Sequence, residues 1–127
     1  HFEKGQGNGV VISYLGSNFR TYFLDKVEQN VAAVRLQVHK LTKNSLDGSI
    51  IAELGQNHEI SLAHFFALLE KQGHGEKGIL LTNGYANIAY IDGWAVHADW
   101  RGGGWCVNAY PVDAPNGWGA GSLVISC

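Results

Sequence analysis

Cysteine is scarce in this sequence, which holds only Cys106 and Cys127 among 127 residues. Two cysteines are too few for the disulfide framework of a small secreted domain, and no CxxC pair indicates a metal or redox site. The two thiols either form one bridge in an oxidising compartment or both stay reduced in the cytosol. The sequence leaves both states open, with an extracellular location expected for the bridged form and a cytoplasmic one otherwise.

Clusters of positive charge and long apolar runs are also missing. The nine Lys and Arg residues are scattered among eleven Asp and Glu residues, for a net charge of −2, so we expect no binding of nucleic acid through its phosphates. No apolar run approaches the roughly 20 residues that a membrane helix needs, so we expect no membrane partner. The glycine-rich stretch 1–9 lacks the apolar segment of a signal peptide and is expected to be a flexible lead-in.

Apolar residues make up 46% of the chain, which is enough for one packed core, and the pattern predicts a single α+β domain over 10–127. The stretch 61–73 is the clearest helix, because Ser61 suits the N-cap and apolar residues recur on one face. The dipeptides NG at 83–84 and DG at 92–93 predict β-hairpins. The expected fold is a twisted, mostly antiparallel β-meander packed against two α-helices. The remaining expected elements are a helix over 17–28 capped by Ser17 and strands over 9–15, 33–41, 49–54 and 122–126.

A third hairpin, with its loop at 101–104, divides the stretch VHADWRGGGWCVNA (96–109) into two faces. Side chains alternate along a strand, so this register opposes Trp100 to Trp105 and Asp99 to Cys106. One face then carries only Val, Ala and Trp, whereas a one-residue slip would mix polar and apolar side chains. The polar face carries His97, Asp99, Cys106 and Asn108.

This polar face holds the residue types of a cysteine hydrolase. In that interpretation Cys106 is the nucleophile, His97 is the base, and Asp99 or Asn108 orients the base. The register argues against it, because Cys106 faces Asp99 and reaches His97 only diagonally. A solvated sheet face with Cys106 as a structural or disulfide-bonded cysteine is the favoured interpretation, so we predict no catalytic residues.

Tryptophans give the apolar face its character. Trp94, Trp100 and Trp105 either stack against a sugar or peptide ligand or pack against the 61–73 helix. The apolar stripe of that helix needs a partner, which favours a role in the core. Trp118 lies in the loop PNGWGAG (115–121), where it is either exposed or folded back over the core.

No metal or cofactor is expected. The glycines at 5, 7 and 9 precede a predicted strand rather than joining a strand to a helix, so they are not a dinucleotide fingerprint. His58, His64 and His74 match no zinc-binding spacing and are expected to be solvated.

Five phrases cover most of the chain from about Val10: ISYLGSNFRTYFL, KNSLDGSIIAELG, LLTNGYANIAYI, WRGGGWCVNA and NGWGAGSLVIS. In these phrases the sequence resembles a family of small uncharacterised bacterial proteins. The resemblance implies a compact domain that exists as a unit, and it implies no assigned activity and no site residues. The terminal Cys127 departs from the family pattern.

Together these patterns favour a non-enzymatic binding domain for a protein, peptide or carbohydrate ligand. Recognition is expected at the 101–104 loop, the loop around Trp118 and the polar face, because loops on a rigid sheet commonly carry binding sites. One alternative is a small cysteine hydrolase that uses Cys106 and His97, and another is a structural subunit that assembles through a strand edge. The residues expected to bind the ligand are Tyr90, His97, Asp99, Arg101, Asn108 and Trp118.

Overall fold

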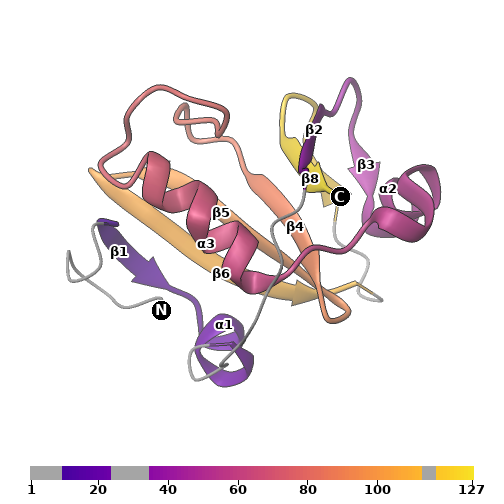
Figure 1. The fold of residues 1–127 in the computed structure, drawn as a ribbon, viewed down its shortest axis with the longest axis horizontal. Helices are drawn as coiled ribbons and strands as arrows, with labels where there is room; N and C mark the ends of the chain where they lie inside the picture. The colour runs from indigo at the N-terminus through magenta and orange to yellow at the C-terminus, as the bar shows by residue number, and fades with distance from the viewer. Residues whose placement is uncertain (1–9, 24–34, 113–116) are drawn as a thin grey trace.

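The fold is built on a six-stranded sheet with helices on either side (Figure 1). The computed structural model describes residues 10–23, 35–112 and 117–127. The predicted lead-in at 1–9 lies outside them. In sheet order the strands are β1 (Ile12–Leu15), β6 (Gly104–Pro111), β5 (Trp94–Arg101), β4 (Asn87–Ile91), β8 (Leu123–Ser126) and β2 (Gln37–Lys40). The other elements are α1 (Ser17–Tyr22), α2 (Asp47–Leu54), a 3-10 turn (Gly55–Asn57), α3 (Leu62–Lys71) and a small ribbon of β3 (Ser45–Leu46) with β7 (Gly117–Trp118).

The α+β class is confirmed, but the sheet is mixed rather than a simple antiparallel meander. Only β4, β5 and β6 follow one another as antiparallel neighbours. The flanking strands β1 and β8 pair in parallel with β6 and β4, respectively. Parallel neighbours need long connections, and these are contacts that local periodicity does not reveal.

The two turns of the central meander are tight because their residues adopt left-handed backbone angles. Asp92 and Gly93 have φ of 52° and 82°, and Gly102 and Gly103 have φ of 61° and 79°. Two successive positive φ values are typical of the turn that matches the twist of paired strands. The predicted register is confirmed, with Trp100 opposite Trp105. The loop itself is shorter than predicted, since residues 101 and 104 are still paired.

The hairpin predicted at Asn83 and Gly84 is wrong. The segment before β4 is irregular, and buried side-chain amides bind its backbone. Leu80 N donates to Gln72 Oε1 at 2.8 Å, and Leu81 N donates to Asn87 Oδ1 at 2.8 Å. These amides replace the strand partner that the dipeptide signal implied.

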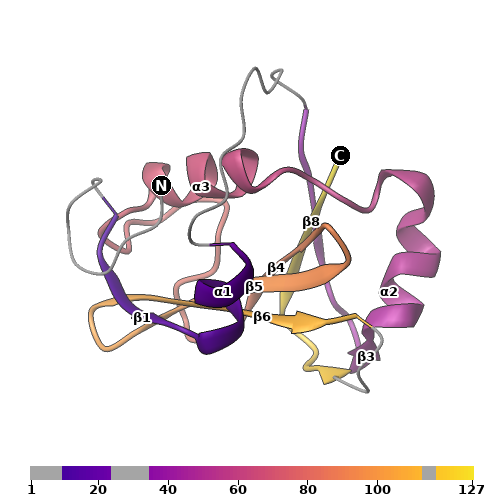
Figure 2. The same cartoon turned by 90° about the horizontal axis from the view of Figure 1, so that it is seen from below.

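Helix α3 covers the apolar face of the central strands, as Figure 2 shows from below. The predicted cap is confirmed, because Ser61 Oγ accepts from His64 N at 3.1 Å. Phe65 and Leu69 are fully buried, together with Trp105, in the first core cluster, the larger of the two groups of buried apolar side chains among the described residues. Trp105 Nε1 donates to the Gln72 carbonyl at 2.9 Å, so the largest core residue has its polar atom satisfied. The core role of Trp105 is confirmed, and Trp94 and Trp100 pack against the same cluster from the rim.

Residues 49–54 form part of helix α2, so the predicted strand is wrong. A short apolar run does not by itself distinguish a strand from a helix. Ile50, Ile51 and Leu54 recur at helical spacing and pack into a second core cluster. Gly55 follows with φ of 71°, a conformation that suits glycine at the end of a helix.

Two other predicted elements are shorter than expected. Helix α1 ends at Tyr22, and its N-cap is Gly16 rather than Ser17. The predicted residues 24–28 lie outside the described part of the chain. Strand β2 forms one edge of the sheet, where Val38 stays 44% exposed. The strand predicted over 33–41 is confirmed only over Gln37–Lys40, and residues 33–34 lie outside the described part of the chain.

A buried carboxylate organises the second core cluster. Asp47, 1% exposed at the start of α2, accepts from Tyr90 Oη and from Trp118 Nε1, both at 2.7 Å. Burial and the Asp47 carboxylate raise the pKa of the Tyr90 hydroxyl well above its ordinary value, so this group stays a donor. One oxygen of Asp47 thus joins α2, β4 and β7. The cluster as a whole comprises Ile50, Ile88, Tyr90, Ala95, Trp118 and Val124.

We expect Asp47→Ala to lower the free energy of unfolding by about 3 kcal/mol, because it leaves two buried donors unsatisfied. Tyr90→Phe removes only one of the two bonds and should cost about 1 kcal/mol. Urea unfolding of both variants tests this expectation, with Glu53→Ala on the exposed side of α2 as the control. A loss below about 0.5 kcal/mol for Asp47→Ala would contradict it.

Candidate functional site

The face of the sheet that points away from α3 is covered by other elements over only part of its width. Helix α2 and the β3–β7 ribbon lie against β4 and β8 (Figure 1). Over β1, β6 and β5 a shallow hollow of about 340 Å³ is left. We call this region the open face, defined by Tyr14, His97, Asp99, Arg101, Cys106, Asn108 and Tyr110. The four polar side chains that the hairpin register placed on one side all line this hollow.

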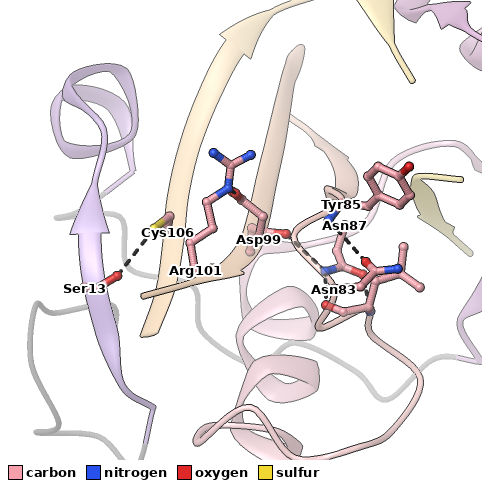
Figure 3. A network of polar contacts seen from close by, with 9 residues as sticks. Ser13, Asn83, Tyr85, Asn87, Asp99, Arg101 and Cys106 are labelled. Atoms are coloured by element: carbon pink, nitrogen blue, oxygen red, sulfur yellow. Dashed lines mark hydrogen bonds and ion pairs between the residues drawn. The ribbon is translucent and has the colours of Figure 1, made fainter. Parts of the chain in front are cut away.

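A local irregularity in β1 supplies one wall of the open face. The register between β1 and β6 shifts between Ile12 and Tyr14, and both Ser13 and Tyr14 are exposed. Such a bulge re-aims side chains at a sheet edge. Ser13 Oγ lies 3.4 Å from Cys106 Sγ, and Figure 3 shows the two groups pointing toward each other across the strands. Tyr14, opposite Cys106, stands 54% exposed beside them.

An ion pair lies at the turn end of β5. Arg101 Nε binds the Asp99 carboxylate, and Figure 3 shows both side chains on the strand next to Cys106. The Arg101 side chain is 68% exposed and the Asp99 side chain only 11%. Burial raises the pKa of the Asp99 carboxyl, and the guanidinium opposes this shift. The buried Asp99 therefore provides a hydrogen-bond acceptor at the floor of the hollow, and the exposed Arg101 provides a donor at its rim. Their opposite charges cancel.

His97 is held between two aromatic rings. Its ring centroid lies 5.0 Å from that of Tyr110 and 5.0 Å from that of Trp118. Burial, with a smaller contribution from Arg101, lowers the pKa of His97 to about 4. Its Nε2 is buried without a hydrogen-bond partner among the described residues. The imidazole is thus neutral at pH 7 and has an unused hydrogen-bonding atom.

Asn108 is fixed by close packing against the chain between β1 and α1. A Cβ on Gly16 would lie only 1.9 Å from Asn108 Cγ, so this contact requires glycine at position 16. Asn108 Oδ1 accepts from Ala109 N at 2.8 Å. Nearby, Asn18 Nδ2 donates to the Ala109 carbonyl at 3.0 Å, which ties α1 to β6. The amide group lining the hollow is therefore positioned before any ligand arrives.

Two of the predicted binding residues lie elsewhere. Tyr90 is fully buried in the second core cluster, so its expected place on an exposed surface is wrong. Trp118 folds back over that cluster and is 9% exposed, the second of the two arrangements that the sequence left open. Its ring packs against His97 and Tyr110 at the border of the open face.

Sequence reasoning missed the two exposed tyrosines of the open face. Tyr110 continues the alternation of Cys106 and Asn108 along β6, so periodicity alone was sufficient to find it. Tyr14 arrives through the parallel pairing of β1 with β6, and no local signal in the sequence indicates that pairing.

The cysteine chemistry suggested by the residue types is not assembled. Cys106 contacts Ser13, Asp99 binds Arg101, and His97 Nε2 has no partner in the described structure. The hydrogen bonds of the site thus join neither a thiol to this imidazole nitrogen nor a carboxylate to it. A nucleophile needs its base within hydrogen-bond reach, although such contacts are often looser without substrate.

Both cysteines are unpaired, and the topology keeps them apart. Cys106 lies on β6, and Cys127 directly follows β8, with β5 and β4 between these strands. Three strand spacings amount to about 14 Å, whereas bridged Cα atoms lie within about 7 Å. The disulfide that the sequence left open is absent from the structure.

A second hollow, of about 510 Å³, lies between β2 and α2 and is lined in part by His39. His39 Nε2 lies 3.1 Å from Ser126 Oγ, a pair that sequence analysis did not indicate. Ser126 is only 3% exposed, so its hydroxyl is not placed to attack a ligand.

Metal-binding and membrane-spanning features were sought over the described ranges. Within 10–23, 35–112 and 117–127, no group of three His, Cys, Asp or Glu side chains is arranged to hold a metal ion. No helix in those same ranges has the length and apolar character needed to cross a membrane.

Comparison of the chain with protein-family models, curated proteins and solved structures finds no match. The resemblance to small bacterial proteins therefore stays a prediction, and the site has to be interpreted from its own geometry.

Alkylation of the denatured protein without reductant should add two alkyl groups to its intact mass, because both thiols are unpaired. Reduction before alkylation should leave that mass unchanged. A protein that takes up alkyl groups only after reduction would contradict the structure.

The free energy of unfolding should decrease as the pH is lowered, and His97 should account for part of this decrease. The unfolded chain takes up a proton at this residue near pH 6.5, whereas the folded protein does so only near pH 4. Unfolding is therefore favoured as pH falls through this window, by on the order of 3 kcal/mol in full. Urea unfolding at pH 7 and pH 4.5 should show a smaller pH-dependent loss for His97→Gln than for the wild type.

The raised pKa of Asp99 has the opposite effect, because it favours the folded state as the pH falls. This effect is present in both the wild type and His97→Gln, so it does not alter the comparison. His74→Gln, at an exposed position, is the control for removing a histidine. If the free energy of unfolding decreases equally in the wild type and in His97→Gln, then His97 has the same pKa in the folded and the unfolded state, and the expectation is wrong.

Proposed function

We propose that this protein is a small non-enzymatic binding domain whose recognition surface is the open face. One observation carries the proposal: polar side chains from β5 and β6 gather in a hollow between two exposed tyrosines. They do so over β1, β6 and β5, on the part of the sheet that α2 does not reach. The sequence expectation of a polar recognition face is kept, with Tyr14 and Tyr110 in place of Tyr90 and Trp118.

Preorganisation supports this proposal. His97, Asp99, Cys106 and Asn108 stand on two central strands whose backbones are paired on both sides. Packing and hydrogen bonds already fix Asn108 and the ring of His97. A ligand then pays little entropy to order the site. Tyrosine and arginine are also the side chains most often found at the energetic centre of binding surfaces.

The cysteine hydrolase is the second candidate, because Cys106 and His97 line the same hollow. It requires the imidazole and the thiol to approach when a substrate binds. Assembly through a strand edge is a third, and β1 and β2 form the two ends of the sheet among the described strands. Neither alternative explains why the two tyrosines flank the polar groups.

A ligand-independent test is an NMR screen of small fragments against the isotope-labelled protein. We expect hits to shift the backbone amides of β5 and β6 around Asp99 and Asn108, and to weaken in Tyr14→Ala. Tyr22→Ala is the matched control, since Tyr22 is 56% exposed but stacks on Trp94 on the other face.

Fragments that gather only in the hollow between β2 and α2, or nowhere, would refute the proposal. Hydrolysis of an ester-bearing fragment that is lost in Cys106→Ala would favour the hydrolase instead.

A further inference from the structure

We infer that the ligand of the open face is a neutral oligosaccharide. This inference rests on the proposed function and narrows it to one chemical class. It is argued below from charge, hydrogen-bonding capacity, ring placement and size.

The charges of the open face cancel. Asp99 and Arg101 form an ion pair, and His97 is neutral at pH 7 because burial holds its pKa near 4. The other lining residues carry no formal charge when Cys106 is in its thiol form. A strongly anionic or cationic ligand would find no opposite net charge here to attract it. A neutral polar ligand does not depend on such attraction.

The polar groups of the open face match hydroxyl groups. Asp99 only accepts hydrogen bonds, Arg101 only donates them, and an amide such as Asn108 does both. A hydroxyl is donor and acceptor at once, so neighbouring hydroxyls on a sugar ring satisfy a mixed set of this kind. The planar carboxylate and guanidinium also favour paired, bidentate contacts.

Two exposed aromatic rings line the hollow beside the polar groups. Tyr14 lies opposite Cys106, and Tyr110 lies four residues further along β6. Four residues of strand span about 13 Å, which is longer than one sugar ring. The exposed rings, 54% and 37% accessible, offer apolar surfaces on which the C–H faces of successive sugars stack.

Size and backbone pairing argue against a protein or peptide. The hollow of about 340 Å³ lies at the lower end of the range for small-ligand sites, whereas a protein partner covers about 800 Å² of each surface. An extended peptide commonly binds by adding a strand to a free sheet edge. Strands β5 and β6, which carry the polar groups, have neighbours on both sides, so a peptide could add a strand beside β1 but not over these groups.

The test is a titration of the isotope-labelled full chain with cellohexaose, maltohexaose and chitohexaose, followed by NMR. With at least one of them we expect saturable shifts at the β5 and β6 amides. The dissociation constant should rise about tenfold in Tyr14→Ala, which corresponds to about 1.4 kcal/mol of lost stacking. Tyr110→Phe, which keeps the ring, and the control Tyr22→Ala, which lies against Trp94 on the other face, should bind like the wild type.

The inference is overturned if none of the three sugars shifts these amides at concentrations up to about 10 mM, or if an anionic oligogalacturonate binds better than all of them. It is equally overturned if a peptide binds the open face and the sugars do not. In each of these cases fragment hits on the open face would leave the proposed binding function standing. If neither fragments nor any of these ligands bind that face, the binding proposal fails as well. Tyr14→Ala removes a side chain outside both core clusters, so a loss of binding would not reflect unfolding.

Discussion

The buried carboxylate of Asp47 is the interaction on which the division of the sheet depends. It holds Tyr90 from β4 and Trp118 from β7 on a single oxygen at the start of α2. A charge in this position is tolerated because two donors meet it and the helix start favours a negative group. Its other oxygen is buried without a partner in the described structure. By fixing Trp118, Asp47 also fixes one of the two rings that enclose His97, although it lies outside the hollow itself.

The two faces of the sheet differ because side chains alternate between them along each strand, and because a different helix covers each face. Alternation along β5 and β6 sends Val96, Trp105 and Val107 toward α3, where a single apolar cluster forms. The opposite side chains face α2 near β4 and β8, but near β1 they face solvent. Helix α2 is only eight residues long, about 12 Å, and so it does not reach across six strands. The open face is what this short cover leaves exposed.

The elements that were predicted correctly are those whose structure is determined by residues close together in the sequence. Helix α3, the turn at 92–93 and the register of β5 with β6 follow from capping, left-handed turn residues and alternation, and the structure confirms them. The errors lie where distant chain segments decide. Residues 49–54 form a helix because Asp47 and Ile50 pack beneath Tyr90 and Trp118, and the NG dipeptide is overruled by the Gln72 and Asn87 amides. The candidate site divides in the same way, since the hairpin face was predictable and the arrival of Tyr14 was not.

The pairing of β1 with β6 has a consequence for when this surface comes into existence. Ser13 and Cys106 are 93 residues apart, so their contact closes one of the longest loops that the chain can form. Closing a long loop costs entropy before any contact compensates for it, and such pairings form late in folding. The β4–β5–β6 meander and α3 need only the second half of the chain. We therefore expect Tyr14 and Ser13 to join them last, so that the complete open face is present only in molecules whose N-terminal strand has docked. A ligand held by both strands would then act as a clasp on the least local contact of the fold.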